Sequence, residues 1–325
     1  MLRVENLKKY FPLKSNFLGH SSGNIYAVDD VSFSIAQGET LGLVGESGCG
    51  KSTLARTILR FYEPSAGRIF FENTDLTSLS ASEMRKKRKE IQMVFQDPVS
   101  SLNPRMNIRS ILSEPFFIHK VKNKKQAEEA IKVLLEKVGI KEEALDLFPH
   151  EFSGGQRQRI CIARAVALNP KFIVCDEPVS ALDVSIRSQI LNLLVSLRKE
   201  YKLAYLFISH DLAVIEHISD RIAVMYLGKI VELASNETLF KRPSHPYTKA
   251  LMEAIPRTDF QGKEKRLLKD AKIIGGDVPS PFHPPSGCHF HPRCPLASER
   301  CKKEAPTLRN IGSKEHPHWV SCHYA

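Results

Sequence analysis

Short hydrophobic runs recur through the first 235 residues and predict the strands of an α/β fold. Residues 2–7 and 25–35 alternate apolar and polar positions, which predicts two strands of an antiparallel edge sheet. Short continuous apolar runs predict the remaining strands. These runs lie at residues 40–44, 68–71, 91–95, 171–175, 204–208, 221–226 and 229–234.

Between these strands the apolar positions follow a helical period. In residues 126–138 the apolar side chains fall on one face of a helix. Further helices are expected over residues 54–59, 153–167 and 187–200. Because the helical block from about 97 to 167 interrupts an alternating α/β pattern, it predicts a subdomain that projects from the sheet.

The composition changes after about residue 235, where prolines and histidines accumulate. A helix at 246–255 is the one regular element expected there, and residues 13–24 are expected to form a loop rich in Ser, Gly and Asn. We therefore predict a first domain over residues 1–235 and a second over 236–325.

The net charge of +11 is compatible with nucleic acid or an anionic surface as a partner. The densest basic run, residues 85–89, has no interleaved aromatic residue for base stacking, which favours a solvated face. No apolar run reaches the roughly 18 residues of a membrane span, and the N-terminus lacks a signal-peptide pattern. These features predict a cytosolic protein that reaches a membrane only through partners.

A glycine-rich stretch follows the strand predicted at 40–44 and fits the pattern G-x-x-x-x-G-K-[ST] of the P-loop, which cradles a nucleotide's phosphates. Glycines let the backbone approach the phosphates, and free N–H groups at the helix start point at the anion. Lys51 is expected to bind the β and γ oxygens of ATP, and the Ser52 hydroxyl to bind Mg²⁺. A chance glycine turn is the alternative, which the flanking strand and helix disfavour. The expected phosphate-binding residues are Gly45, Glu46, Ser47, Gly48, Cys49, Gly50, Lys51, Ser52 and Thr53.

Two acidic residues stand at the end of the strand predicted at 171–175. Asp176 is expected to hold Mg²⁺, and Glu177 to polarise the water that attacks the γ-phosphate. An acidic pair at a strand end is more often a helix cap, but its position after a P-loop favours catalysis.

Residues 151–159, EFSGGQRQR, resemble the signature motif of the ABC (ATP-binding cassette) ATPases. The resemblance implies that the start of the following helix is a second anion site, which closes on the ATP held by another ATPase subunit in a sandwich dimer. The residues expected there are Ser153, Gly154, Gly155 and Gln156. It also implies a P-loop NTPase fold of the ABC type: a mixed or parallel sheet core, an antiparallel edge sheet, a helical subdomain, and a small irregular cysteine-containing C-terminal domain.

The same resemblance assigns roles to single residues. Gln96 matches the Q-loop glutamine that touches Mg²⁺ and water, Asp183 lies in the D-loop, and His210 matches the switch histidine at the γ-phosphate. An early aromatic residue is expected to stack on adenine. Phe11 is the preferred candidate, with Tyr10 and Tyr26 as alternatives.

Three further stretches look like the dipeptide/oligopeptide importer ATPases: residues 95–105, 245–251 and 287–295. The resemblance implies an ATPase at the cytoplasmic face of the membrane that powers peptide import. Its expected partners are two membrane permeases, a second and homologous ATPase, and an extracytoplasmic peptide-binding protein. Some relatives carry nickel chelates or glutathione instead.

Two other functions fit the sequence less well. A soluble ABC ATPase acting on nucleic acid in repair or translation has only the positive charge in its favour, so no nucleic acid is expected. A regulatory subunit with an inactive site is disfavoured because every catalytic position matches the family pattern.

Four of the seven cysteines crowd the last 38 residues, with the spacing C-x5-C-x6-C-x20-C. In a reducing compartment such a group favours a metal site over disulfides. Some members of the importer family hold a [4Fe–4S] cluster with these cysteines, so we expect one at Cys288, Cys294, Cys301 and Cys322. Zn²⁺ is the alternative, free thiols come third, and nearby histidines could replace a cysteine as ligand.

Overall fold

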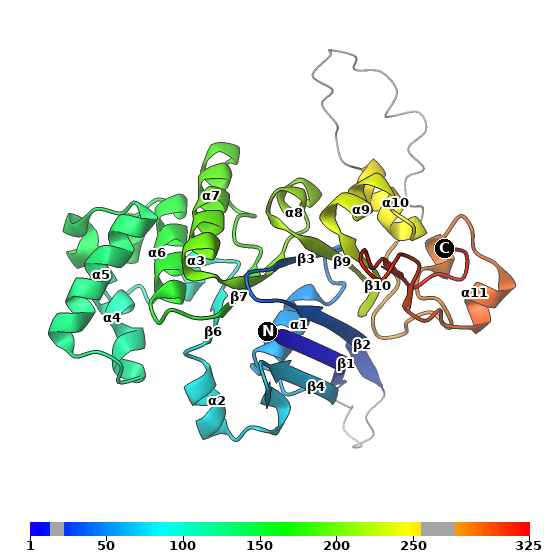
Figure 1. The fold of residues 1–325 in the computed structure, drawn as a ribbon, viewed down its shortest axis with the longest axis horizontal. Helices are drawn as coiled ribbons and strands as arrows, with labels where there is room; N and C mark the ends of the chain where they lie inside the picture. Colours follow the sequence, from blue (N-terminus) through cyan, green and yellow to red (C-terminus); the bar gives the residue numbers. More distant parts are fainter. Residues whose placement is uncertain (14–22, 255–276) are drawn as a thin grey trace, which may run out of the picture. The chain divides into compact units, whose positions relative to one another are not determined.

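The computed structural model describes residues 1–13, 23–254 and 277–325 (Figure 1). Most of the loop predicted at 13–24 and the last residue of the helix predicted at 246–255 lie outside these residues. The chain divides into two compact units. The P-loop unit comprises Arg3–Ser34, Leu41–Phe70 and His210–Ala325, and the helix-rich unit comprises Met1–Leu2, Ile35–Thr40 and Phe71–Ser209.

The helix-rich unit is built on three parallel strands, β6 (Ile91–Val94), β7 (Phe172–Asp176) and β8 (Ala204–Ile208). Every residue of β7 and β8 is buried, as expected for parallel strands covered on both faces. The strands predicted at 91–95, 171–175 and 204–208 are thereby confirmed. The unit's other elements are β5 (Thr74–Asp75), α2 (Ala81–Lys87), α3 (Pro98–Ser101), α4 (Ile108–Ile118), α5 (Lys124–Val138), α6 (Gly154–Val166), α7 (Val184–Tyr201) and three 3₁₀ helices (Leu76–Ser78, Glu142–Asp146 and Pro149–Glu151).

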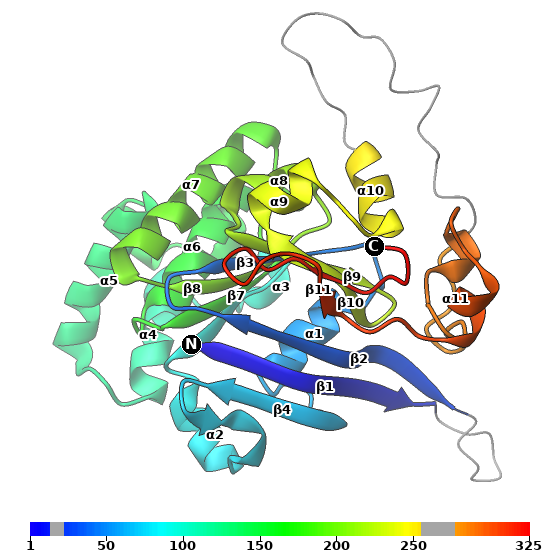
Figure 2. The same cartoon turned by 45° about the vertical axis from the view of Figure 1, so that its right-hand side comes forward.

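The helical block predicted within this unit is present, with α4, α5 and α6 packed on one another (Figures 1 and 2). Helix α5 shows why the sequence was informative. Asn123 and Gln126 form a reciprocal capping box at its start, and Gly139 ends it at φ 69°. Its buried face consists of Ala127, Ile131, Leu134, Leu135 and Val138, all of which belong to the predicted stripe.

The P-loop unit contains two groups of strands. In one, the order is β11-β12-β10-β9-β3, with β3 (Thr40–Val44) parallel to β9 (Arg221–Tyr226) and β9 antiparallel to β10 (Lys229–Ser235). In the other, β1 (Leu2–Pro12) lies between β2 (Asn24–Ile35) and β4 (Ala66–Phe71), as Figure 2 shows. The unit's helices are α1 (Lys51–Ile58), α8 (Leu212–Ile218), α9 (Asn236–Lys241), α10 (Pro246–Glu253), α11 (Glu299–Lys303) and the 3₁₀ helix His291–Arg293.

The C-terminal region contributes strands that the sequence did not predict. Strand β12 (Trp319–Val320) pairs antiparallel with β10, where Val320 lies opposite Glu232, and β11 (Arg309–Asn310) pairs with β12. Val320 is fully buried. A strand of two residues is too short to produce a recognisable alternation, so only the pairing reveals it.

None of the helices within the described residues combines the length and the apolar character that crossing a membrane requires.

Candidate nucleotide-binding and hydrolysis residues

The predicted site residues are divided between the two units. The P-loop and His210 belong to the P-loop unit. The acidic pair, Gln96, the signature stretch and Asp183 belong to the helix-rich unit.

The loop between β3 and α1 requires glycine for two physical reasons. Gly50 precedes α1 at φ 109°, a conformation that side chains rarely tolerate, and Gly48 stands at φ 79°. A Cβ atom on Gly50 would lie 2.0 Å from the carbonyl oxygen of Ala27. The glycines therefore keep the loop close to the neighbouring strand, and the anion-binding role of the start of α1 stays a prediction.

The lysine of the P-loop is held by the loop itself. Lys51 is 5% exposed, and its Nζ donates hydrogen bonds to the carbonyl oxygens of Gly45 (2.7 Å) and Glu46 (3.0 Å). A buried ammonium needs such partners to offset its lost hydration. These two bonds hold the charged end of Lys51 against the backbone of the loop.

In the helix-rich unit, β7 delivers the acidic pair and joins it to Gln96. Asp176 is 1% exposed at the end of β7. Glu177 follows at φ 47°, and its N–H donates to the carbonyl of Ile208 at 3.0 Å. Gln96, just beyond β6, donates from Nε2 to Glu177 Oε2 at 3.1 Å. A left-handed conformation at a residue other than glycine is strained, and such strain is concentrated at functional sites.

The stretch expected to be the D-loop, residues 180–183, is hydrogen-bonded to Glu177. Ser180 donates from both its N–H (3.3 Å) and its Oγ (3.1 Å) to the carbonyl of Glu177. Asp183 is exposed and directly precedes α7. The backbone position of Glu177 is therefore linked to the segment that carries Asp183.

The signature stretch forms the first turn of α6. Ser153 accepts a hydrogen bond from the Gln156 N–H (3.3 Å), and Gln156 returns one to the Ser153 N–H (2.9 Å), a capping box. A Cβ atom on Gly155 would lie 2.5 Å from Ile186 of α7, so close packing requires glycine there. Ser153 and Gly154 are exposed. The predicted helix start is confirmed, whereas the anion-binding role stays a prediction.

The aromatic candidates for adenine stacking lie on β1 and β2. Tyr10 is engaged within the protein, since it donates to Asp29 at 2.6 Å and packs edge-on against Tyr26. Phe11 packs edge-on against Tyr62, with ring centroids 5.4 Å apart. The choice of Phe11 stays a prediction. His210 is exposed directly before Asp211, whose carboxylate caps α8.

Two residues that the sequence analysis missed contact the P-loop. Arg293 pairs with the carboxylate of Glu46, and the hydroxyl of Tyr247 accepts the Glu46 N–H at 2.9 Å. Both residues lie more than 200 positions further along the chain. The only sequence signal was that both belong to the stretches resembling importer ATPases.

Two of the four C-terminal cysteines, Cys288 and Cys294, respond to the charges of the others. The N–H of Cys288 donates to the carbonyl of Cys301 at 2.8 Å. Burial first, and then the negative charges of Cys301, Cys294 and Cys322, raise the pKa of the Cys288 thiol to about 11. Burial and the charges of Cys322 and Cys301 also raise the pKa of Cys294. Bound positive charge beside Cys288 and Cys294 would therefore favour the thiolate form of both residues.

Within residues 1–13, 23–254 and 277–325, however, no group of three or more His, Cys, Asp or Glu side chains is arranged to hold a metal ion. A tetrahedral zinc site would need its sulfur ligands about 2.3 Å from one ion. The described residues therefore form no preformed site for either the predicted cluster or the zinc alternative, and both stay predictions.

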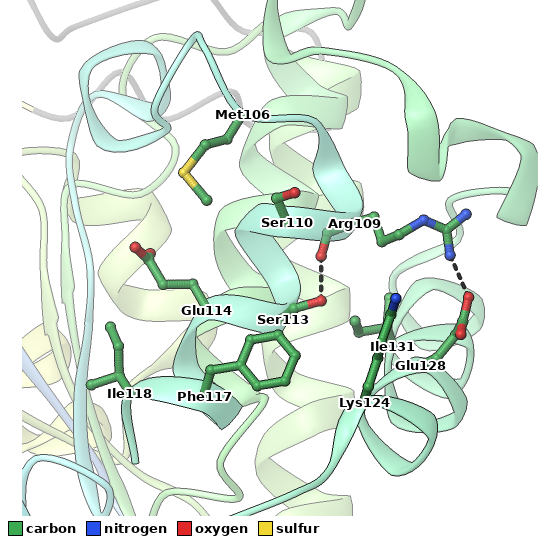
Figure 3. A pocket seen from close by; sticks show the side chains of 10 residues that line it. All are labelled: Met106, Arg109, Ser110, Ser113, Glu114, Phe117, Ile118, Lys124, Glu128 and Ile131. Carbon is green, nitrogen blue, oxygen red and sulfur yellow. Dashed lines mark hydrogen bonds and ion pairs between the residues drawn. The ribbon is translucent and has the colours of Figure 1, made fainter. Parts of the chain in front are cut away.

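A separate pocket of about 410 Å³ is lined by residues of α4 and α5 and by Met106, which precedes α4 (Figure 3). Phe117, Met106 and Ile131 supply apolar surface, and Arg109 and Glu128 form an ion pair of 2.6 Å at its edge. None of the predicted nucleotide-site residues lines this pocket.

A glycine loop between a buried strand and a helix, with an acidic pair ending another buried strand, defines the class of P-loop nucleotide-binding proteins.

Residues 28–180 match the family described as ABC transporter, and residues 231–301 match the family described as oligopeptide/dipeptide transporter, C-terminal region. The chain is 50% identical over 324 residues to the oligopeptide transport ATP-binding protein AppF of Bacillus subtilis, with 99% of this chain and 97% of that protein covered. It is 51% identical over 308 residues to the probable peptide ABC transporter ATP-binding protein y4tS of Sinorhizobium fredii, with 95% and 86% covered. The chain belongs to the ABC transporter family of ATPases and carries the C-terminal region of the family's oligopeptide/dipeptide transporters.

Solved structures agree with this assignment. The cassette MJ0796, described as dimeric in a post-hydrolysis state with ADP and Pi, superposes with a TM-score of 0.65 at 27% identity and covers 73% of this chain and 99% of its own. The structure of cbiO1 from Clostridium perfringens, part of an ABC transporter complex, gives a TM-score of 0.64 at 28% identity and covers 74% and 90%. The predicted ABC-type α/β fold is confirmed, and the protein is an ATPase that uses ATP and Mg²⁺.

Proposed function

We propose that this chain is the ATP-hydrolysing subunit that powers import of dipeptides or oligopeptides through a membrane permease. The observation that carries the hydrolytic part of the proposal is the 3.1 Å hydrogen bond between Gln96 and Glu177, next to the buried Asp176. It joins a polar side chain to the carboxylate suited to polarise an attacking water. The relatives named as oligopeptide and peptide transport ATP-binding proteins support the substrate class.

The proposed division of labour follows the chemistry of each side chain. Residues 45–53 bind the phosphates of ATP, and Lys51 neutralises the β and γ oxygens. Ser52, Gln96 and Asp176 hold Mg²⁺, which offsets charge on the same oxygens. Glu177 orients the water. His210 contacts the γ-phosphate, and Phe11 stacks on adenine. These assignments rest on position in the motifs and on the local geometry described above.

The proposed assembly places this subunit on the cytoplasmic face of the membrane. A peptide importer needs two permeases, a second ATPase and an extracytoplasmic binding protein, and the names of the relatives support a permease complex. The predicted division into residues 1–235 and 236–325 is retained as part of the proposal. Nickel chelates or glutathione remain alternative cargoes, whereas no observation favours nucleic acid.

The hydrolysis proposal predicts a specific defect for Glu177→Gln. The amide keeps the size and the hydrogen bond to Gln96 but cannot polarise water. ATP turnover by the transporter assembled in membranes should therefore fall at least about a hundredfold, while ATP binding persists. The measurement is phosphate release together with retention of labelled ATP.

Glu129→Gln is the matched control, because Glu129 is an exposed glutamate on α5 of the same unit. It should hydrolyse ATP as the wild type does. Near-normal turnover by Glu177→Gln would exclude Glu177 as the residue that activates water. A wild-type complex whose ATPase activity is insensitive to dipeptides and oligopeptides would instead contradict the cargo.

We also propose that the four C-terminal thiolates hold one [4Fe–4S] cluster. Each cysteine of a cubane binds its own iron, so the sulfurs stand farther apart than around a single ion. Cys288 and Cys294, whose thiol pKa values respond to the charges of the other C-terminal cysteines, are candidates for two of its ligands. The Tyr324 hydroxyl bonds to Ser298 Oγ at 2.6 Å, which ties the Cys322 end of the chain to the Cys301 turn. Such a cluster would supply a structural staple for a region with little regular structure.

Metal analysis of protein purified without oxygen tests this proposal. We expect a brown protein with about four irons per chain and broad absorbance near ~400 nm, and we expect Cys294→Ser to lose both. One zinc per chain in a colourless protein would show that the four cysteines bind zinc and not a cluster. Freely alkylated thiols without metal would exclude both metals.

A further inference from the structure

The P-loop carries a carboxylate that is neutralised by the C-terminal region. Arg293 Nη1 donates to Glu46 Oε2 at 2.8 Å, and Nη2 donates to Oε1 at 3.1 Å. This two-pronged geometry is the strongest form of an arginine–carboxylate pair. The side chain of Arg293 is 7% exposed and that of Glu46 is 25% exposed, so solvent screens the pair only partly.

The guanidinium depends on this partner. Its Nε is buried and has no hydrogen-bond partner among the described residues. Besides its bonds to Glu46, the Arg293 guanidinium makes a 3.5 Å contact from Nη1 to the Tyr226 hydroxyl. Because an arginine buried in this way must be compensated, the Glu46 carboxylate supplies most of what offsets its lost hydration.

The backbone of Glu46 is held by the same region. Tyr247 of α10 is fully buried and accepts the Glu46 N–H through its hydroxyl. Its ring packs against Tyr226 at 4.7 Å and against Phe290 at 5.4 Å. Phe290 stands three residues before Arg293, so one packed cluster orients both groups that hold Glu46.

The negative charge of Glu46 is what links its contact with Arg293 to phosphate binding. Glu46 follows Gly45 in the loop whose N–H groups and lysine attract phosphate, and Lys51 Nζ binds the Glu46 carbonyl at 3.0 Å. An uncompensated carboxylate at this position would repel the phosphates of ATP.

We propose that Arg293 is a positioning residue of the nucleotide site, which neutralises Glu46 and fixes the P-loop so that ATP binds tightly. The inference rests on the proposed role of residues 45–53 in binding ATP. It makes nucleotide affinity depend on the C-terminal region, because Arg293 directly precedes Cys294.

The test is titration calorimetry of the full-length protein with Mg-ATP and Mg-ADP. In Arg293→Gln the dissociation constant for ATP should rise about tenfold, which corresponds to about 1.4 kcal/mol. The rise should be smaller for ADP, which carries less charge, and should shrink in high salt, which screens the repulsion. Arg293→Lys should lose less than Arg293→Gln. Arg300→Gln, at an exposed arginine paired with Glu304, is the matched control and should bind ATP as the wild type does.

Removing the carboxylate as well separates electrostatics from packing. Glu46→Gln/Arg293→Gln should regain most of the lost affinity, because no negative charge is left to repel phosphate. Equal ATP affinity in Arg293→Gln and the wild type would overturn the proposal. A loss that is identical for ATP and ADP, indifferent to salt and not rescued by Glu46→Gln would also overturn it, since that pattern indicates a purely structural contact.

Two variants keep the test decisive. Where Arg293→Gln fails to fold, Arg293→Lys decides: it keeps the charge but loses the two-pronged bond, so it should weaken ATP binding more than ADP binding, and unchanged ATP affinity overturns the proposal. Lys51→Ala reports on the proposed function instead. Normal ATP binding by Lys51→Ala, or no binding by the wild type, would contradict the nucleotide-site assignment itself.

Discussion

At the scale of single residues, His245 shows how burial sets a protonation state. Its side chain is 1% exposed at the start of α10, where Nδ1 accepts the Tyr247 N–H at 3.1 Å. The backbone N–H of His245 donates to the buried carboxylate of Glu232 at 2.9 Å. Burial, with a smaller contribution from the positive charge of Lys249, lowers the pKa of the imidazole to about 3. The neutral ring is therefore the form that the fold accommodates.

This protonation state predicts a pH dependence. Unfolded chains bind a proton at His245 near pH 6.5, whereas the folded protein does not until about pH 3. The contribution of neutral His245 to the stability of the fold is fully present above pH 6.5. It is lost as the pH falls toward 3, because the unfolded state binds more protons in that window. His245→Asn keeps an acceptor for the Tyr247 N–H but cannot be protonated. From about pH 7 to about pH 5, its unfolding free energy should fall by about 2 kcal/mol less than that of the wild type.

Urea unfolding at both pH values measures the difference. His217→Asn, at an exposed histidine on α8, should keep the wild-type pH dependence. An equal loss of stability in His245→Asn and the wild type would show that His245 does not carry the effect.

At the scale of elements, the first turn of α6 combines a cap with a tight helix–helix contact. The capping box of Ser153 and Gln156 satisfies N–H groups at the helix start, which local sequence alone explains. Local sequence does not explain the close approach of α7. A Cβ atom on Gly155 would lie only 2.5 Å from Ile186 of that helix. The two neighbouring glycines of the signature stretch are therefore physically distinct.

Alanine substitutions should separate them. Gly155→Ala should lower the free energy of unfolding by about 1–3 kcal/mol, because its methyl group would overlap the branched side chain of Ile186. Gly154→Ala meets Leu182 at an ordinary 3.7 Å and should change stability little. Ile186→Ala introduced together with Gly155→Ala should remove the clash. Equal melting temperatures for the two single variants would contradict this account.

At the scale of the whole molecule, the exposed signature turn fits a role toward a second subunit. A solved structure of the cassette MJ0796 is also described as dimeric. We predict that the signature turn acts on the ATP bound by its partner. A Lys51→Ala chain and a Ser153→Arg chain should each be inactive alone, whereas a dimer containing one of each should keep one intact site and recover ATPase activity.

Tandem purification through two different tags isolates the mixed dimer for this measurement. Dimers that carry the same variant twice, selected in the same way, are the controls. If the mixed dimer is no more active than either control, the signature turn acts on the ATP bound by its own chain. A non-identical partner ATPase would require the signature variant in that partner.

Local sequence determined the elements and the chemistry that depend on neighbouring residues. The P-loop, the buried β7 ending in Asp176, and the capped α5 follow from spacing, periodicity and turn residues, all of which act within one element. Pairing across the chain was decided by tertiary structure. Gln96 meets Glu177 across 81 positions, and Arg293 meets Glu46 across 247. No periodicity encodes such contacts, because they depend on how separately formed strands and turns pack. The same holds for β12, whose two residues become a strand only because β10 offers its unpaired edge.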